Sequence, residues 1–452
     1  MNLAETIRAA GIVGCGGAGF PTHVKYTGGQ TETILVNGAE CEPLLATDRY
    51  LMRHFAREIV SAAAALGRET GAKRCVIALK AAYTAERAAL EAAIAEQAAP
   101  VALHLLESFF PAGDEQSLVF EVTGRVVPPG GIPLAVGCVV NNTATVLCIH
   151  HAMEGRPFTQ KYLTVTGEVA APCIVKAPVG TPVEACIALA GGTPLSDYAV
   201  VNGGPMMGRP MTREEAGHAY VTKTMSGLIV LPPDSPVVRR AQTRPEQMVN
   251  RARSACIQCS FCTQLCPRAL LGHPLQPHRI MRRLAAGGLE ALLDTPEGRS
   301  AALCCECGIC EIYACPMGLQ PRQVNAALKK ELARNKIRYQ GEETDCQARQ
   351  ERAFRKAPAA RVAARTGVAA YAGISIDQLR RAAPKRVVLS LRQSAGAPAE
   401  SVVRSGERVE LGQRIAACPQ GALGADLHAS ISGTVTVEAE WIAIDADKGG
   451  ER

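Results

Sequence analysis

Two cysteine runs in the second half of the chain have the spacing of metal-cluster ligands. The first, CIQCSFCTQLCP, separates its cysteines by two, two and three residues and ends in proline. Thiolates at this spacing bind [4Fe–4S] clusters, with the fourth cysteine binding the other cluster of a pair. A second run is therefore expected, and CCECGICEIYACP supplies it with a last gap one residue longer.

We assign the eight cysteines to two [4Fe–4S] clusters by exchanging the last ligand of each run. One set is Cys256, Cys259, Cys262 and Cys315, and the other is Cys304, Cys307, Cys310 and Cys266. Cys305 lies inside a gap and is not expected to be a ligand. Zinc is the alternative, because CxxC pairs also bind zinc, but two interlocked runs favour iron–sulfur. We expect the remaining cysteines, such as Cys75, Cys148 and Cys173, to be small buried residues.

A glycine-rich loop near the start of the chain could hold a phosphate. GIVGCGGAGFPTHVK contains Gly14, Gly16 and Gly19 at the G-x-G-x-x-G spacing of dinucleotide loops. That fingerprint needs a strand before the glycines, whereas a helix is predicted here. We therefore interpret the stretch as a different phosphate cradle, in which backbone N–H groups and Lys25 face an anion.

Composition and charge exclude several classes of function. The 452 residues are 47% hydrophobic and 20% charged, which is typical of a folded chain of about three domains. Aromatic residues make up only 4%, and the net charge of +7 is spread along the chain, which argues against nucleic-acid binding. No apolar run approaches the ~20 residues that span a bilayer, and no signal sequence is present, so we expect a cytoplasmic protein without a membrane span.

The order of the predicted elements indicates a multidomain α/β protein. Strands at 32–40, 74–80 and 101–108 alternate with helices at 49–71 and 84–97, which predicts a helix-covered parallel sheet over residues 1–155. The predicted parts that follow are a small α+β module (156–235), a helical two-cluster domain (240–335), a helical or flexible connector (336–383) and a lipoyl-like β-sandwich (384–446). A swinging-arm carrier needs a lysine at its hairpin tip, but Ser430, Ile431 and Ser432 stand there, so we expect a structural domain.

The residues around the glycine loop carry a family resemblance. GCGGAGFPTHVK followed by NGAECEP closely resembles the FMN-carrying, NADH-oxidising subunit of respiratory complex I and the RnfC subunits of ion-pumping oxidoreductases. AGDE (112–115) and VVNNTAT (139–145) continue the resemblance, and YLTVTGEV resembles the start of a soluble-ligand-binding β-grasp (SLBB) domain. The resemblance implies an FMN/NADH-binding sheet, an SLBB β-grasp domain and a ferredoxin-like domain with two clusters.

The resemblance also implies a set of cofactor-binding residues. The FMN phosphate and ribityl chain would contact Gly14, Gly16, Gly17 and Lys25. The rest of the flavin pocket would be formed by Asn37, Glu40, Asn141, Asn142 and Thr145. Glu42 and Glu115 would flank the nicotinamide of NADH. No catalytic side chain is expected, because the cofactors carry the chemistry.

Four features depart from the complex I and RnfC pattern. Ala39 stands where complex I has an acidic residue, Phe110 is offset, and Asp114 replaces a glutamate. These departures concern the NADH contacts more than the FMN contacts. The lipoyl-like domain of RnfC lies at the N-terminus, whereas here it is expected at the C-terminal end.

That domain order, together with CCECGICEIYACPMGLQPRQVN, is closely similar to the cobalamin reductases of propanediol-utilising bacterial microcompartments. This resemblance implies NADH-dependent reduction of cobalamin, with an adenosyltransferase and shell proteins as partners. The alternatives are an electron donor to another microcompartment acceptor, such as a glycyl-radical activating enzyme, and a non-enzymatic electron-conducting scaffold. Asp426, His428 and Ile431 match the D-x-H-x-x-G pattern of a base-off cobalamin site only in part, so we expect His428 to be structural.

Overall fold

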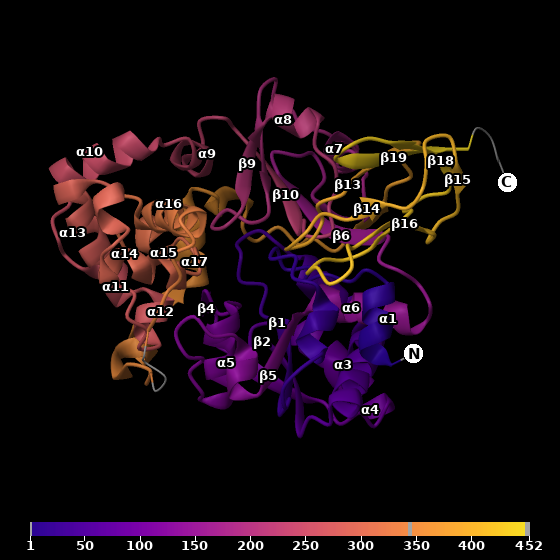
Figure 1. The fold of residues 1–452 in the computed structure, drawn as a ribbon, viewed down its shortest axis with the longest axis horizontal. Coiled ribbons are helices and arrows are strands. Elements are labelled where there is room, and N and C mark those ends of the chain that lie inside the picture. The colour runs from indigo at the N-terminus through magenta and orange to yellow at the C-terminus, as the bar shows by residue number, and fades with distance from the viewer. Residues whose placement is uncertain (1, 342–345, 448–452) are drawn as a thin grey trace.

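The computed structural model describes residues 2–341 and 346–447. In Figure 1 the helices that carry the cysteine runs lie at one end of the molecule and the C-terminal strands at the other, with the sheets that contain β1 and β10 between them. Over the described residues, no helix combines the length and the apolar character needed to cross a bilayer.

The N-terminal part is built on a parallel sheet in the order β3-β2-β1-β5. Its strands are β1 (Thr33–Gly38), β2 (Arg74–Lys80), β3 (Ala102–Leu106) and β5 (Cys138–Asn142), with a short β4 (Phe109–Phe110) beside them. Its helices are α1 (Leu3–Ala9), α2 (Thr47–His54), α3 (Ala56–Thr70), α4 (Thr84–Glu96), α5 (Glu115–Thr123) and α6 (Thr143–Met153). Side chains alternate along β1, so Ile34 and Val36 join the core that includes α3 and α6, while Leu35 joins Leu118 of α5 on the other face.

The glycine loop lies between α1 and the short 3-10 helix η1 (Thr22–Tyr26). Among the described residues, its only ladder contact is an isolated bridge between Val13 and Pro21, and no strand of the described chain leads into it. The predicted helix 49–71 was wrong in one respect, because α2 ends and α3 begins around Phe55. Phe55 packs against Tyr50 and Tyr162 with ring centroids 6.5 and 5.4 Å away, so tertiary contacts override the continuous helical pattern.

The second sheet is mixed and six-stranded, in the order β12-β7-β6-β10-β8-β9. Its elements in the expected α+β module are β6 (Gln160–Gly167), β7 (Cys173–Pro178), α7 (Val183–Leu189), β8 (Ala199–Asn202), β9 (Arg209–Thr212), α8 (Arg213–Gly217) and β10 (Gly227–Leu231). Thr164 in β6 contacts the first part directly, because its Oγ1 accepts the backbone N–H of Ala46 at 3.0 Å. This contact places the second sheet over the loop that follows β1.

The cysteine runs lie among short helices. These are α9 (Pro236–Ala241), α10 (Pro245–Ala255), α11 (Phe261–Gln264), α12 (Pro267–Leu270), α13 (Pro277–Gly287), α14 (Pro296–Ser300), α15 (Ile309–Ile312) and α16 (Pro321–Arg334), with the 3-10 turns η3 (Glu290–Leu292) and η4 (Ala301–Leu303). Several begin at proline, whose fixed φ suits the first helical position and whose missing N–H has no helical partner there. The core beneath them includes Leu284, Val324 and Leu328.

The described part of the expected connector is not a free linker. It contains η5 (Gln350–Phe354), β11 (Ala357–Pro358), α17 (Ala359–Thr366), η6 (Ala369–Tyr371) and β12 (Leu379–Arg381). β11 pairs with β4 of the first part and β12 pairs with β7 of the second sheet. Residues 342–345 of the predicted connector lie outside the described residues.

The C-terminal strands form two sheets, β13-β19-β18-β15 and β14-β16-β17. Their bounds are β13 (Arg386–Ser390), β14 (Glu400–Ser401), β15 (Arg408–Val409), β16 (Arg414–Ala417), β17 (Leu427–His428), β18 (Gly433–Val437) and β19 (Trp441–Ala446). At the turn where a carrier lysine would stand, Ser430 is 1% exposed and donates its hydroxyl to the carbonyl oxygen of Val179. A buried turn of this kind has no room to swing, which agrees with a structural domain.

Candidate functional site

A cavity of about 580 Å³ opens where β1 and β5 end. Asn37 pairs in register with Asn142, so the polar ends of the two parallel strands meet at one edge of the sheet. The volume lies within the range of small-molecule and cofactor sites. Eight of the predicted cofactor residues line the cavity: Gly14, Gly16, Lys25, Asn37, Glu40, Glu42, Glu115 and Asn142.

The other three predicted cofactor residues lie behind the cavity wall or beside it. Thr145 is buried, and its hydroxyl accepts the N–H of Cys15 at 2.9 Å, so it holds the glycine loop from beneath. Asn141 points to the opposite face of β5, where its amide nitrogen donates to the hydroxyl of Tyr26 at 2.5 Å. Gly17 is not part of the lining, although it belongs to the same loop.

The glycine loop has the shape of an anion cradle. Gly17 has a φ of 109°, which a side chain rarely adopts, and a Cβ there would meet nothing within 4 Å. Gly19 has a φ of 62°, and a Cβ on it would lie 2.9 Å from Thr224. Gly14 and Gly16 of the same loop line the cavity, so backbone without side chains faces it there, and this fits a flavin phosphate.

Two lysines supply positive charge to the cavity, and one of them was not predicted. The ammonium group of Lys25 donates to the carbonyl oxygen of Val140 at 2.6 Å and lies 3.4 Å from a carboxylate oxygen of Glu115. Lys161, at the start of β6, is 3% exposed and donates to the carbonyl oxygen of Cys15 at 3.2 Å. In the sequence Lys161 is only a polar residue before an apolar strand, and nothing there indicates that the second sheet brings it under the glycine loop.

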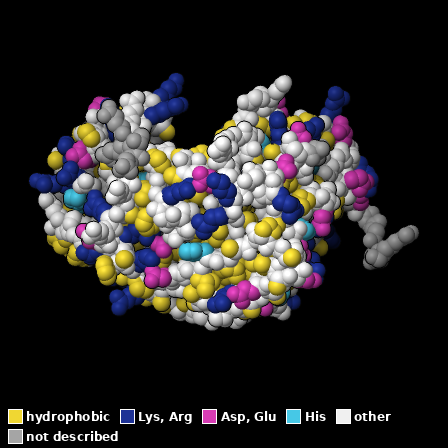
Figure 2. Space-filling view, turned by 90° about the horizontal axis from the view of Figure 1, so that it is seen from below, with side chains coloured by type: hydrophobic (Ala, Val, Ile, Leu, Met, Phe, Trp, Pro, Cys, Tyr) yellow, Lys and Arg dark blue, Asp and Glu magenta, His cyan; other side chains and the backbone are white. Residues whose placement is uncertain are grey.

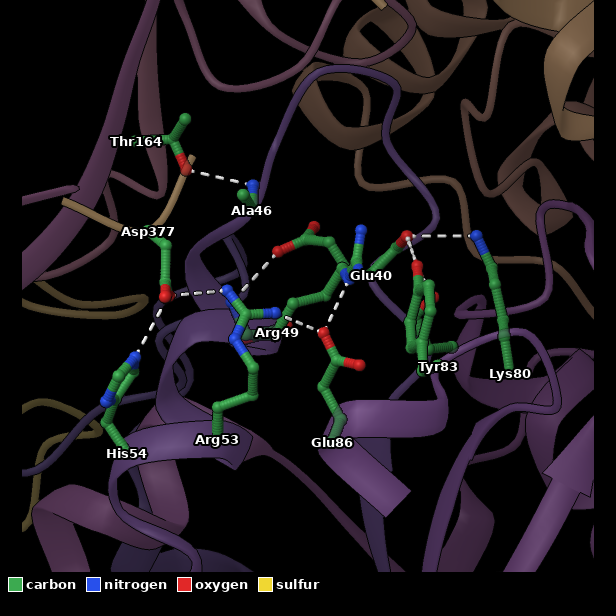
Figure 3. A network of polar contacts seen from close by, with 12 residues as sticks. Glu40, Ala46, Arg49, Arg53, His54, Lys80, Tyr83, Glu86, Thr164 and Asp377 are labelled. Carbon is green, nitrogen blue, oxygen red and sulfur yellow. Dashed lines mark hydrogen bonds and ion pairs between the residues drawn. The ribbon is translucent and has the colours of Figure 1, made fainter. Parts of the chain in front are cut away.

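Glu40 is held in an unusual backbone conformation at the cavity. Its φ is 25°, and its carbonyl oxygen accepts hydrogen bonds of 3.1 Å from Lys80 and from Tyr83, as Figure 3 shows. Its carboxylate accepts the N–H of Asp48 at 3.1 Å. Burial and the nearby Asp48 raise the pKa of Glu40 to about 8, so its carboxyl group is mostly protonated at neutral pH.

Asp48 is a second buried acid in the cavity wall that sequence reasoning missed. It is 8% exposed, and its carboxylate accepts the amide N–H of Asn142 at 2.7 Å. Burial raises the pKa of Asp48 to about 6. Asn142 in turn caps α6, because its side-chain oxygen accepts the N–H of Ala144 at 2.9 Å.

Glu42 lines the cavity, but its carboxylate is engaged by the second sheet. It accepts the backbone N–H groups of Met206 and Met207, each at 2.9 Å. Burial raises the pKa of Glu42 to about 7, although these hydrogen bonds favour the ionised form. Glu42 therefore fastens the loop after β1 to the β8–β9 turn, and its contact with nicotinamide stays a prediction.

The eight predicted cluster cysteines line two separate cavities. Cys256, Cys259, Cys262 and Cys315 lie around one of them, and we call it the outer cavity. Cys266, Cys304, Cys307 and Cys310 lie around the other, the inner cavity, together with Cys305. Each set combines three cysteines of one run with the last cysteine of the other. Four thiols per cavity are the donor set that a [4Fe–4S] cluster needs.

The two cysteine loops repeat the same backbone turn. Gln258 and Ser260 have φ of 55° and 61°, and the matching residues Glu306 and Gly308 have 56° and 78°. Left-handed residues on either side of the second cysteine curl each loop around its cavity. Backbone N–H groups also reach two of the sulfurs, from Glu306 to Cys304 and from Leu319 to Cys315, both at 3.3 Å. In the described part of the chain, no group of three or more His, Cys, Asp or Glu could hold a single metal ion.

The inner cavity and the cavity at the sheet edge share a wall. Cys305 and Cys307 line both of them. The contact is held by Arg268, next to the proline after Cys266, which donates to both carboxylate oxygens of Asp114 at 2.6 and 2.9 Å. Both side chains are about nine-tenths buried. Asp114 thus has a definite role, since it also caps α5 by accepting the N–H of Ser117 at 3.0 Å.

Four family models match successive parts of the chain. Residues 7–151 match the Nuo51 FMN-binding domain, 162–210 the SLBB domain, 255–320 the 4Fe-4S dicluster domain and 374–447 the RnfC barrel sandwich hybrid domain. These matches confirm the predicted fold class. Together with the cradle and the two four-thiol cavities, they define a flavoprotein oxidoreductase with FMN and two [4Fe–4S] clusters.

Comparison with whole proteins gives the particular family. The chain is 42% identical to cobalamin reductase PduS of Salmonella typhimurium over 97% of its own length and 95% of the relative. It therefore belongs to the PduS family. It is 34% identical to a component of the ion-translocating oxidoreductase complex of Vibrio cholerae over 61% of this chain and 34% of that one. A solved NAD+-reducing [NiFe]-hydrogenase is 21% identical to this chain, and the match covers 73% of this chain and 62% of the hydrogenase chain with a TM-score of 0.48.

Proposed function

We propose that this protein oxidises NADH and passes the electrons through FMN and two [4Fe–4S] clusters to cobalamin. The observation that supports it best is the shared wall, where Cys305 and Cys307 line the flavin cavity as well as the inner cavity. When bound, FMN accepts a hydride from NADH and the clusters carry electrons one at a time. The chain's own task is to hold these groups at fixed positions and to keep water out.

The cavity residues have distinct proposed roles. Gly16 and Gly17 present backbone N–H groups to the FMN phosphate, and Lys25 with Lys161 supply its counter-charge. Gly14 lines the cavity beside them, but its N–H donates to the carbonyl oxygen of Phe20 at 2.9 Å, so its part is to shape the loop. Asn37 joins the two loops at the flavin ring, because it donates to the carbonyl oxygen of Gly113 at 2.9 Å and accepts the N–H of Ala39 at 3.1 Å.

The remaining cavity residues complete the ring and nicotinamide sides. Glu40 and Asn142 border the flavin ring, while Glu42 and Glu115 lie on the side proposed for nicotinamide. Asn141 and Thr145 act from behind the wall, through Tyr26 and the Cys15 N–H.

The proposal also includes the division of the chain into five parts. These parts are residues 1–155, 156–235, 240–335, 336–383 and 384–446.

Cobalamin is proposed as the acceptor because the relatives of full length are cobalamin reductases. His428 is not a candidate cobalt ligand, because it is only 6% exposed. It lies in β17 and is paired in register with Arg414 of β16. Cobalamin would therefore meet the protein only transiently, or on a partner such as an adenosyltransferase. A location inside a microcompartment, with shell proteins nearby, follows from the same relatives and is likewise proposed.

Anaerobic spectroscopy tests the proposal in two stages. Adding NADH to the purified holoprotein should bleach the flavin absorbance near its visible maximum, and failure with both NADH and NADPH would leave only the scaffold alternative. Cob(I)alamin should then form from cob(II)alamin in the presence of NADH and be trapped as adenosylcobalamin by an adenosyltransferase. Flavin bleaching without cob(I)alamin would favour another acceptor, such as a glycyl-radical activating enzyme.

A further inference from the structure

The outer cavity lies at the far end of the molecule from the flavin cavity. It is bordered by the loop between α10 and α11, by α13, and by the segment after α15. In Figure 1 α10, α11 and α13 form the outer edge of the molecule, whereas α12 lies next to β4. Since the inner cavity shares its wall with the flavin cavity, the outer cavity is the one from which electrons would leave.

The surface over the outer cavity is unusually apolar. Ile257 is 61% exposed and Met317 is 40% exposed, and both line the cavity directly. Phe261, one residue before the ligand Cys262, is 45% exposed. Exposed large apolar side chains grouped around one point are characteristic of the centre of a protein interface.

A basic rim surrounds this apolar centre. Between Arg244 and Arg283 the sequence contains seven arginines and a single acidic residue, Glu246. Arg268 is not part of the rim, since it is the buried partner of Asp114, and Arg283 is paired with Glu297. Arg251 donates to the carbonyl oxygen of Met317 at 3.3 Å, which places it at the edge of the cavity. Exposed Arg279 and Arg282 lie next to His278, a residue of the cavity lining. Figure 2 shows Lys and Arg side chains along this end of the molecule, at the left of the view.

The outer cavity itself is too small for an organic acceptor. Its volume is about 30 Å³, far below the several hundred Å³ of pockets that hold small molecules. An acceptor must therefore dock on the surface rather than enter a pocket. A second copy of this chain is disfavoured as the occupant, because each copy carries a net charge of +7.

We propose that the exit surface, formed by Ile257, Phe261, Met317, Arg251, Arg279 and Arg282, docks a protein that presents acidic side chains and carries the electron acceptor. This inference rests on the proposed function, since it takes the outer cluster as the last carrier in the chain. The apolar centre excludes water at the contact, and the arginine rim orients an acidic partner during the encounter.

Native and succinylated cytochrome c test the charge argument, because they carry the same haem on a basic and an acidic surface. At low salt the wild-type holoprotein, given NADH anaerobically, should reduce the succinylated form about tenfold faster than the native form, and salt should remove the difference. The double variant Arg279→Glu with Arg282→Glu should lose this preference. Its matched control, Arg57→Glu with Arg408→Glu, makes the same charge change at exposed positions on α3 and β15 and should keep it.

Two measurements separate this inference from the proposed function. Electron paramagnetic resonance must show both clusters in each variant, so that a lost cluster is not mistaken for a lost contact. If NADH fails as the donor, protein reduced with dithionite and then desalted supplies the electrons, and the exit surface is tested alone. Equal rates for the two cytochromes, or an equal effect of both double variants, would overturn the inference. An unchanged preference after Arg279→Glu with Arg282→Glu would place the exit elsewhere, at a corrinoid site or another surface.

Discussion

Replacing the charged end of Arg268 should weaken the contact between the cluster domain and the flavin domain. Arg268 makes two hydrogen bonds to Asp114, and both side chains are about nine-tenths buried. In Arg268→Met the apolar stem remains but Asp114 is left buried without its partner. Breaking a buried pair in this way costs about 3–5 kcal/mol, mostly because the remaining charge is uncompensated.

This cost should appear as local opening, since the pair joins two domains rather than a single core. Because each 1.4 kcal/mol is a factor of ten, amide hydrogen exchange at α12 and at the start of α5 should speed up by about two to three and a half powers of ten. The measurement is anaerobic hydrogen–deuterium exchange followed by mass spectrometry, with α4 as the internal reference. Reduction of the clusters by NADH should slow in parallel, while flavin bleaching should not.

The pH dependence of the variant gives a sharper test. Burial alone would raise the pKa of Asp114, but the Arg268 guanidinium and Ser117 hold it below its ordinary value. Because the pKa of Asp114 is lowered, the wild-type pair contributes its full stabilisation above about pH 4. This contribution to the free energy of unfolding is lost only when stronger acid protonates Asp114. Without Arg268, burial is less opposed and the pKa of Asp114 rises. Protonation then removes the unpaired charge of Asp114, so the increase in amide exchange rate caused by Arg268→Met should become smaller as pH falls from 8 to 5.

The double variant Arg268→Met with Asp114→Asn provides the control, because Asn at 114 keeps the helix cap and removes the charge. It should exchange more slowly than Arg268→Met alone. If the double variant opens as much as the single one, the explanation by an unpaired buried charge is wrong.

Three further predictions concern the cofactor sites. Cys259→Ala and Cys307→Ala should each abolish one of the two [4Fe–4S] signals in electron paramagnetic resonance, whereas Cys305→Ser should keep both; retention of both signals in either alanine variant would refute the ligand assignment. Lys161→Met should weaken FMN binding about ten- to hundred-fold, the value of one charge-assisted hydrogen bond, as measured by flavin fluorescence on dilution, and unchanged affinity would remove Lys161 from the phosphate site. Because the pKa of Glu40 is about 8, its carboxyl group ionises as pH rises past this value, so FMN retention should fall between pH 7 and 9 in the wild type and stay level in Glu40→Gln; the same fall in both would contradict the role of Glu40.

The sequence predicts the parts of this protein whose signals are local. The boundaries of β2 coincide with the predicted strand at 74–80, because a run of apolar residues between turns is a sufficient signal for a buried parallel strand. The cysteine runs likewise predict which thiols should meet, since their spacing follows from the geometry of a cluster. The fold class was predicted correctly for the same reason, as each domain carries its own motif.

What the sequence does not reveal depends on contacts between domains. β11 and β12 are only two and three residues long, and each is a strand through its pairing with a distant segment: β11 with the equally short β4, and β12 with β7. Lys161 reaches the glycine loop only when the second sheet packs over the first. Glu42 belongs to the local motif NGAECEP, which drew attention to it. Its hydrogen bonds from the backbone of Met206 and Met207, however, depend on a turn more than 160 residues further along the chain.

The way the cluster domain is attached explains how a single chain can keep two cofactor cavities in contact. Arg268 lies just after the predicted ligand Cys266 and pairs with Asp114 at the start of α5, while buried Arg352 of the connector pairs with Glu121 near the end of the same helix. Lys356 adds a second contact to Glu121 at 3.2 Å, and β11 continues it by pairing with β4. The chain is thus fastened to one helix both within the cluster domain and after it. A domain held by buried charges at both points cannot swing away without leaving them unpaired, so these ion pairs keep the wall formed by Cys305 and Cys307 at the flavin cavity.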